Sequence, residues 1–209
     1  MKTIIKKDEW NRYETFKHYD SCTNPFIIIS SKIDITNIYN YAKRHQLSMY
    51  ASLGYLISIT ANEFDGFKLR KENEYFVLYE NIIPNFTENI NGENVYYFDV
   101  KLEDSISKYN EEFIKLREMY SKQETIFTSE PNEIWLSCAP WFSFNTLTPP
   151  YNHDLLIPQL IWDKFNKEND KVTTNLMVMI HHGFMDGYQI GMFYKKLEEN
   201  IKNFKGDEN

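Results

Sequence analysis

The chain has 209 residues and a formal net charge of −7, from 23 Lys or Arg residues against 30 Asp or Glu residues. This length predicts a single domain over residues 1–209, and the 15 Tyr, 15 Phe and 4 Trp residues require a sizeable buried core. An acidic chain without a Lys/Arg block is a poor nucleic-acid binder, and its longest apolar runs fall far short of the roughly 20 residues of a membrane span, so we expect a soluble protein.

Helices with one apolar face are predicted in the first third of the chain. Helical spacing of aromatic residues predicts a helix over Asp8–Tyr19, with Asp8 as its cap. A short β-branched run at Phe26–Ile29 predicts a buried strand. Asp34 and Ser48 are then expected to cap two further helices.

The middle of the chain changes towards the two-residue period of strands. One predicted hairpin joins Phe67–Arg70 to Tyr75–Tyr79. A second joins Ile82–Thr87 to Val95–Leu102 through a turn at Asn91-Gly92. This part of the chain is therefore expected to form antiparallel strand pairs.

The last part of the chain returns to alternating helices and strands. A long amphipathic helix is expected from about Asp104, and an irregular loop around Pro149-Pro150. Strands are expected at Glu133–Cys138, Leu160–Phe165 and Val172–Ile180, and a final helix over about Tyr188–Phe204. The whole pattern predicts the α/β class, as a two-layer sandwich of a mixed, mostly antiparallel sheet with helices packed on one face.

Cysteine usage and the N-terminus point to the cytoplasm. Two cysteines, Cys22 and Cys138, do not make a disulfide framework in a chain with an adequate core. The first residues lack the apolar stretch of a secretory signal. No Cys-x-x-Cys or His-Glu-x-x-His motif is present, so we expect no metal site.

The most unusual local sequence is His181-His182-Gly183-Phe184-Met185-Asp186-Gly187. It follows an apolar strand and precedes the last helix, so its polar groups lie at a strand terminus, where rigid scaffolds present reacting groups. Two structural alternatives stay open. Asp186 with Gln189 forms a capping box that could serve only to start the helix, and the histidines could be core residues.

A catalytic role fits the acid–base chemistry of histidine. Its unperturbed pKa near 6.5 leaves neutral imidazole abundant at cytoplasmic pH, able to take a proton from a hydroxyl or thiol. A positioned base contributes roughly 10²–10⁴-fold to a rate. Neither Ser137 nor Cys138 stands in a Gly-x-Ser-x-Gly elbow. We therefore expect a base-catalysed transfer between two bound substrates rather than a covalent intermediate.

These residues resemble a known family. His-His-x-x-x-Asp-Gly after a hydrophobic strand is similar to the active-site signature of chloramphenicol acetyltransferases, although peptide-synthetase condensation domains and plant acyltransferases carry the motif too. Three further segments match the family in order: Trp10–Tyr19 (Trp-x-Arg-x-Glu-x-Phe-x-x-Tyr), Ser31–Thr36 (Ser-Lys-Ile-Asp-Ile-Thr) and Leu136–Trp141 (Ile-Ser-x-x-Pro-Trp). The resemblance covers nearly the whole chain and implies the coenzyme A-dependent acyltransferase fold.

The resemblance implies an O-acetyltransferase that moves an acetyl group from acetyl-CoA to a hydroxyl of chloramphenicol and so inactivates the antibiotic. His182 is the implied general base. Ser137 would donate a hydrogen bond to the tetrahedral oxyanion, a contact worth about 3–4 kcal/mol in comparable sites. Asp186 would pair with Arg12 and hold the His182 loop rather than react. Without the resemblance, Ser137 is interpreted as an ordinary strand serine and Arg12 as a solvated helix residue.

Ligand contacts are implied in the same way. The resemblance places aromatic residues along a coenzyme A tunnel, and a lysine beside the ribose phosphate: Trp141, Tyr50, Phe165 and Lys164. Tyr19 matches a tyrosine of the acceptor pocket, and Phe127 is a looser candidate. In this family the site lies between the subunits of a trimer, with His182 from one chain and the acceptor pocket largely from its neighbour, so a homotrimer is implied.

Several residues depart from the family pattern. Ser48 stands where a second phosphate-binding lysine is often found. Trp135 replaces a small polar residue two positions before Ser137, and Ile161 replaces a threonine that helps to position a water molecule. The loop Phe144–Leu155 also differs strongly. These changes leave the implied transfer chemistry intact and put the identity of the acceptor in doubt.

Two other functions remain as alternatives to chloramphenicol acetylation. One is the same chemistry on another hydroxyl or on an amine. The other is a non-catalytic protein that binds or sequesters a small molecule. The departures at Ser48 and Ile161 favour this last alternative. The intact His182 and Ser137, together with the Arg12 and Asp186 pair, oppose it.

Overall fold

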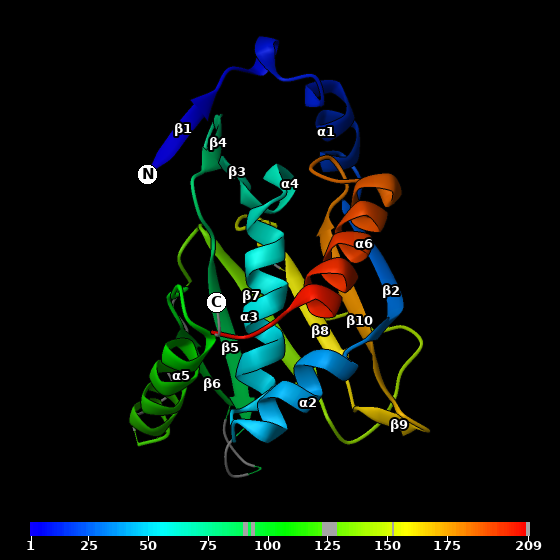
Figure 1. Cartoon of the computed structure of the whole chain (residues 1–209). Coiled ribbons are helices and arrows are strands. Elements are labelled where there is room, and N and C mark those ends of the chain that lie inside the picture. The colour runs from blue at the N-terminus through cyan, green and yellow to red at the C-terminus, as the bar shows by residue number, and fades with distance from the viewer. Residues whose placement is uncertain (90–91, 93–94, 123–128, 152, 208–209) are drawn as a thin grey trace.

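Two β-sheets and a layer of helices make up the fold of the computed structural model (Figure 1), which describes residues 1–89, 92, 95–122, 129–151 and 153–207. The large sheet has the strand order β2-β10-β8-β7-β5-β6, with β9 paired to β10. Its strands are β2 (Phe26–Asp34), β5 (Ile83–Asn89), β6 (Val95–Asp99), β7 (Glu133–Ala139), β8 (Gln159–Asp163), β9 (Asn166–Glu168) and β10 (Lys171–His181). β7 pairs in parallel with both β5 and β8, and the other neighbours are antiparallel. The predicted mixed, mostly antiparallel sheet is confirmed.

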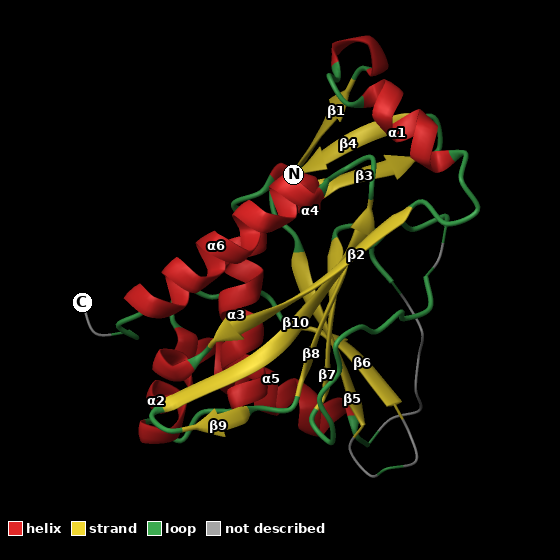
Figure 2. Cartoon of the chain, turned by 90° about the vertical axis from the view of Figure 1, so that its right-hand side faces the viewer, coloured by secondary structure: helices red, strands yellow, loops and turns green. Residues whose placement is uncertain are grey.

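Helices pack on one face of this sheet (Figure 2). They are α2 (Thr36–Arg44), α3 (Met49–Asn62), α5 (Ile106–Tyr120) and α6 (Gly187–Asn203). Helix α3 lies in the middle, against α2, α5 and α6 as well as β5 and β7. Ten of its 14 residues are buried, so the predicted single apolar face is wrong for α3: a helix enclosed by neighbours must be apolar on nearly all sides.

Alternation along the strands decides which side chains the helices cover. Cross-strand pairing aligns Phe86, Leu136, Leu160, Val178 and Ile29 in one row. All of these except Ile29, which is partly buried, are fully buried beneath the helices. Each buried side chain of this size contributes about 1.5–3 kcal/mol. Because successive side chains point to opposite faces, Ser137, the residue after Leu136, points away from the helix layer.

A second, three-stranded sheet lies at one end of the molecule with the first helix (Figures 1 and 2). Its order is β1-β4-β3, from β1 (Lys2–Ile5), β3 (Leu69–Glu72) and β4 (Tyr75–Tyr79). Strand β4 has the predicted bounds. The predicted strand Phe67–Arg70 is instead divided between the helix α4 (Asp65–Lys68) and β3, and β1 was not predicted.

The predicted helix Asp8–Tyr19 is wrong in its first half. A 3-10 turn, η1 (Lys7–Glu9), ends before Trp10, whose extended backbone interrupts the helix, and α1 (Tyr13–Asp20) begins only after Arg12. An apolar residue is needed at position 10 because the ring of Trp10 packs on Phe76 of the small sheet, with centroids 4.6 Å apart. Tyr13 and Phe16 also pack on Phe76, so these three aromatic positions share a tertiary contact without forming one continuous helix.

The other predicted caps have side-chain partners. Ser48 accepts a hydrogen bond from the backbone N–H of Ala51 at the start of α3, as expected. Asp34 accepts from the N–H of Thr36 and so also stabilises the start of α2, although Ile35 occupies the N-cap position. None of the described helices is long and apolar enough to cross a membrane.

Candidate active site

The turn after β10 carries His182 and is fixed on both sides. The backbone N–H of His182 donates to the carbonyl of Pro25, which lies 2.8 Å away, just before β2. Its imidazole stacks on the ring of Tyr19, with centroids 3.9 Å apart and planes 5° from parallel. The Nδ1 atom is enclosed and has no hydrogen-bond partner among the described residues, so this nitrogen is closed to an incoming molecule.

Arg12 clamps this turn from the start of α1. Its Nε donates to the carbonyl of Gly183 at 3.0 Å, and its Nη2 to the carbonyl of His182 at 3.3 Å. Its Nη1 lies 3.2 Å from Oδ2 of Asp186. The planar fork of a guanidinium suits three acceptors at fixed angles. The structure thus brings the predicted Arg12, Asp186 and His182 together.

Asp186 serves as helix cap and ion-pair partner at once. Its side chain accepts from the N–H groups of Tyr188 and Gln189, and Gln189 completes the capping box. Partial burial acts to raise the pKa of this carboxyl, but the bonds from Gln189, Arg12 and Tyr188 outweigh it and hold the pKa below its usual value. Asp186 therefore stays ionised and orients the turn.

The two adjacent histidines have different environments. His181 is fully buried and stacks on Phe16 at 4.3 Å. Burial is the main reason why its pKa falls to about 4. His181 is thus uncharged at neutral pH and part of the core, as the alternative interpretation of the two histidines proposed. His182, by contrast, is only partly buried.

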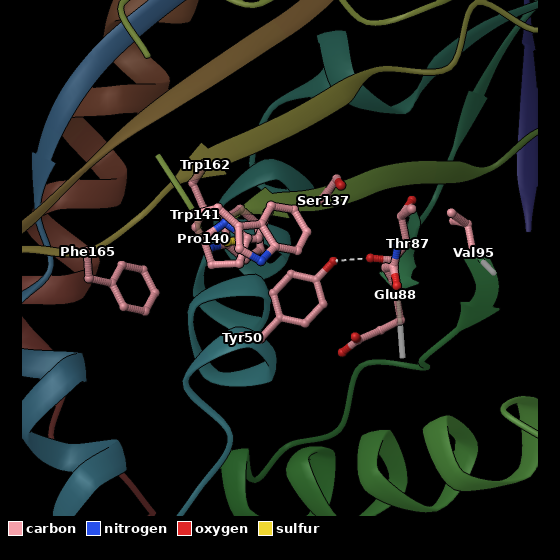
Figure 3. A pocket seen from close by; sticks show the side chains of 11 residues that line it. Tyr50, Thr87, Glu88, Val95, Ser137, Pro140, Trp141, Trp162 and Phe165 are labelled. Carbon is pink, nitrogen blue, oxygen red and sulfur yellow. Dashed lines mark hydrogen bonds between the residues drawn. The ribbon is translucent and has the colours of Figure 1, made fainter. Parts of the chain in front are cut away.

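A separate cavity of about 430 Å³, which Ser137 helps to line, lies at the ends of β5, β7 and β8 (Figure 3). The predicted Trp141, Tyr50 and Phe165 line it, together with Pro140 and Trp162. Trp141 is 70 % exposed, which is unusual for an indole and leaves a large apolar surface at the rim. The Tyr50 hydroxyl lies 2.8 Å from the carbonyl of Thr87, so its ring is held in place as a cavity wall.

Two charged or reactive groups of the cavity were not predicted to line it. Glu88 pairs with Arg117, with Oε1 and Nε 3.2 Å apart, and burial raises the pKa of its carboxyl despite this arginine. Nothing in the sequence distinguishes Glu88 from other polar strand residues. Burial, followed by the nearby Asp163 and Glu88, raises the pKa of Cys138 to about 12. The Cys138 thiol is therefore protonated at neutral pH and a weak nucleophile.

Three other predicted residues lie elsewhere. Lys164 is exposed beside Phe165 but does not line the cavity. Tyr19 contacts His182 rather than the cavity. Phe127 lies outside the described residues. No cluster of three or more His, Cys, Asp or Glu side chains that could hold a metal ion occurs in the described part of the chain.

Within one chain, Ser137 and His182 are far apart. Ser137 pairs with Ile161 on β8, and Ile161 pairs with Met177 on β10. His182 lies five residues beyond Met177, just past the end of β10, and β10 is two strands away from β7. With about 3.3 Å per residue and 4.8 Å per strand, the separation is roughly 20 Å. One copy of the chain cannot bring both side chains to the same reacting carbon.

The three departures from the family pattern have identifiable surroundings. Ser48 has a structural role as the cap of α3. Ile161 lies directly opposite Ser137 in the strand register. Trp135 points to the same side of β7 as Ser137, and its indole Nε1 donates to the carboxylate of Glu133 at 2.8 Å. Two bulky apolar groups thus flank Ser137.

Comparison of folds first defines the fold class, which this chain shares with solved acetyltransferases. A solved chloramphenicol acetyltransferase superimposes with a TM-score of 0.83 at 22% identity, over 96% of this chain and 100% of its own. A probable dihydrolipoamide acetyltransferase from Listeria monocytogenes gives 0.71 at 16% identity, over 96% of this chain and 94% of its own.

Sequence comparison then defines the family. The family model for chloramphenicol acetyltransferase matches residues 2–198. A chloramphenicol acetyltransferase of Staphylococcus aureus is 28% identical over 208 residues, covering 95% of each chain. Chloramphenicol acetyltransferase 3 of Escherichia coli is 24% identical over 91% of this chain and 92% of its own. The chain belongs to the chloramphenicol acetyltransferase family and is an acyltransferase.

Proposed function

We propose that this enzyme transfers the acetyl group of acetyl-CoA to a hydroxyl of chloramphenicol and so inactivates the antibiotic. The observation that carries the proposal is the clamped turn of His182, in which Arg12, Asp186 and Tyr19 fix a partly exposed imidazole at a strand end. The aromatic cavity that Ser137 helps to line supports it, because the volume and apolar walls of this cavity suit an extended thioester arm. The free thiols of Cys22 and Cys138 fit the reducing cytoplasm, where we place the reaction.

In the proposed reaction, Nε2 of His182 takes the proton of the acceptor hydroxyl while the oxygen of that hydroxyl attacks the thioester carbonyl. The carbonyl π electrons move to oxygen, and Ser137 donates a hydrogen bond to the resulting oxyanion. When the carbonyl re-forms, the carbon–sulfur bond breaks and the sulfur leaves with the proton held by His182. The products are the acetyl ester and free coenzyme A. Lys164, beside the cavity, would meet a ribose phosphate.

We further propose that the active unit is a homotrimer with sites between subunits. The roughly 20 Å between Ser137 and His182 in one chain supports this, because Ser137 of one copy must then face His182 of another. A test is to co-express Ser137→Ala and His182→Ala chains. Each mixed trimer would regain one intact site, so activity should rise well above the low rate of either variant alone. No recovery from verified mixed trimers would contradict the arrangement.

A second acceptor class is favoured by one observation. Trp135 and Ile161 put bulky apolar groups next to Ser137, where the family pattern has smaller polar ones. The space for the acceptor would then be smaller and less polar. The same transfer to another hydroxyl or to an amine is therefore the alternative to chloramphenicol.

The decisive assay measures free thiol released from acetyl-CoA over a panel of acceptors. We expect release that depends on chloramphenicol and falls about 10²–10⁴-fold in His182→Ala. His45→Ala, which removes an exposed histidine, is the matched control and should keep the full rate. Release with another acceptor alone would reassign the substrate. Tight binding of chloramphenicol by calorimetry, without any thiol release, would indicate a sequestering protein.

A further inference from the structure

A chain of polar contacts behind the His182 turn joins three separate elements. Nζ of Lys71, in β3, lies 2.8 Å from Oδ2 of Asp20, the last residue of α1. The other oxygen of Asp20 lies 3.6 Å from Nε2 of His181, at the end of β10. His181 Nδ1 in turn accepts the backbone N–H of Gly183 at 3.1 Å. The carboxylate of Asp20 therefore stands between a surface lysine and a buried imidazole.

The hydrogen bond from Gly183 determines the tautomer of His181. Because Nδ1 accepts this bond, the proton of the neutral ring is on Nε2. Nε2 is buried and makes no hydrogen bond among the described residues, so the nearby Asp20 is the group that this N–H faces. Three charged or titratable groups act on the ring: Asp20 favours its protonation, whereas Lys71 and His182 oppose it.

These contacts reach both sides of the His182 ring. Tyr19, which stacks on that ring, directly precedes Asp20 in α1. Gly183, whose N–H is held by His181, directly follows His182, and its backbone is so close to Phe16 of α1 that a Cβ there would lie 2.5 Å from Phe16 Cα. The end of α1 and the turn can therefore shift relative to each other only if this packing changes.

We infer that Asp20 is a positioning residue that, by bridging Lys71 and His181, holds the His182 imidazole against Tyr19. The inference deepens the proposed function, since it takes His182 as the general base. Asp20 itself does not touch the reacting atoms. It fixes the angle at which His182 meets the acceptor, and small errors in such angles are costly to a rate.

The test compares variants of Asp20 with a matched control on the same helix. Asp20→Ala should lower kcat/KM about tenfold, through kcat rather than KM. Asp20→Asn keeps an oxygen that faces the His181 Nε2–H and should stay within about threefold of wild type. Glu14→Gln, which breaks the exposed 2.7 Å pair with Lys17, should leave kcat/KM unchanged. Lys71→Gln keeps the Asp20 carboxylate but removes its ion pair with Lys71. This variant should therefore also lower kcat/KM, by less than Asp20→Ala does.

A spectroscopic readout separates positioning from loss of the proposed activity. The stacked Tyr19 ring should shift the His182 ring protons upfield in the NMR spectrum. This shift should weaken in Asp20→Ala and persist in Asp20→Asn and Glu14→Gln. If Asp20→Ala does not fold, Lys71→Gln gives the same comparison. An unchanged ring-current shift, or equal kinetics in Asp20→Ala and Glu14→Gln, would overturn the inference. A wild-type chain that acetylates nothing would overturn the proposed function instead, while the NMR shift still decides the role of Asp20.

Discussion

Removing the Arg12 clamp should destabilise the protein by more than its ion pair alone explains. Arg12 makes three bonds, to the carbonyls of His182 and Gly183 and to the carboxylate of Asp186, and its side chain is 24 % exposed. A buried hydrogen bond to a charged group contributes about 1.5–3 kcal/mol, and partial exposure reduces this. We expect Arg12→Ala to lower the free energy of unfolding by about 2–3 kcal/mol in total.

Asp186→Asn isolates the ion pair from the other contacts. Asn caps helices about as well as Asp, so the start of α6 should survive and only the charge is lost. Because Asp186 is 40 % exposed, we expect a cost of about 0.5–1 kcal/mol. In an Arg12→Ala background, the same change should cost less than about 0.5 kcal/mol, since its partner is already gone.

Urea unfolding of the two single variants and the double variant measures these three quantities. Arg12→Lys is a useful fourth chain, because it keeps the charge but cannot reach three acceptors at once, and it should resemble Arg12→Ala more than wild type. If Arg12→Ala costs no more than Asp186→Asn, the bonds to the two carbonyls contribute nothing and the clamp argument is refuted.

Three further predictions concern stability. Burial raises the pKa of Glu133 from 4.5 to about 7, so the unfolded chain loses a proton that the folded chain keeps. The free energy of unfolding of the wild type should therefore fall by about 2–3 kcal/mol between about pH 4.5 and 7, relative to that of Glu133→Gln. If urea unfolding gives the same pH dependence for both proteins, this prediction is contradicted. Gly183→Ala should destabilise the protein by about 1–3 kcal/mol because the added Cβ meets the Phe16 backbone. Gly191→Ala in α6, where a Cβ has open space, should instead stabilise the protein by about 0.5–1 kcal/mol. Thermal melting of the two variants compares these effects. Arg70→Met should lower the free energy of unfolding in urea by at least about 3 kcal/mol, because the fully buried guanidinium donates to four backbone carbonyls. A smaller decrease would mean that those carbonyls find other donors.

The sequence by itself determined what depends on neighbours a few residues apart. Strand β4 and the Ser48 cap follow from side-chain alternation and from one local hydrogen bond, and both were predicted. The turn of His182 between an apolar strand and a capped helix could be located for the same reason. The family, and with it the acyltransferase fold, could be recognised because its motifs are contiguous and in order. That residues 1–209 form a single domain stays a prediction.

The tertiary structure decided everything that depends on strand register and on contacts between distant segments. Only register separates Ser137 from His182 by about 20 Å, because position in a sheet depends on pairing and not on spacing along the chain. Only packing distinguishes His181 from His182, since one peptide step takes the side chain from the core to a partly buried position. The stack of Tyr19 on His182 joins segments more than 160 residues apart, a contact that no local pattern encodes.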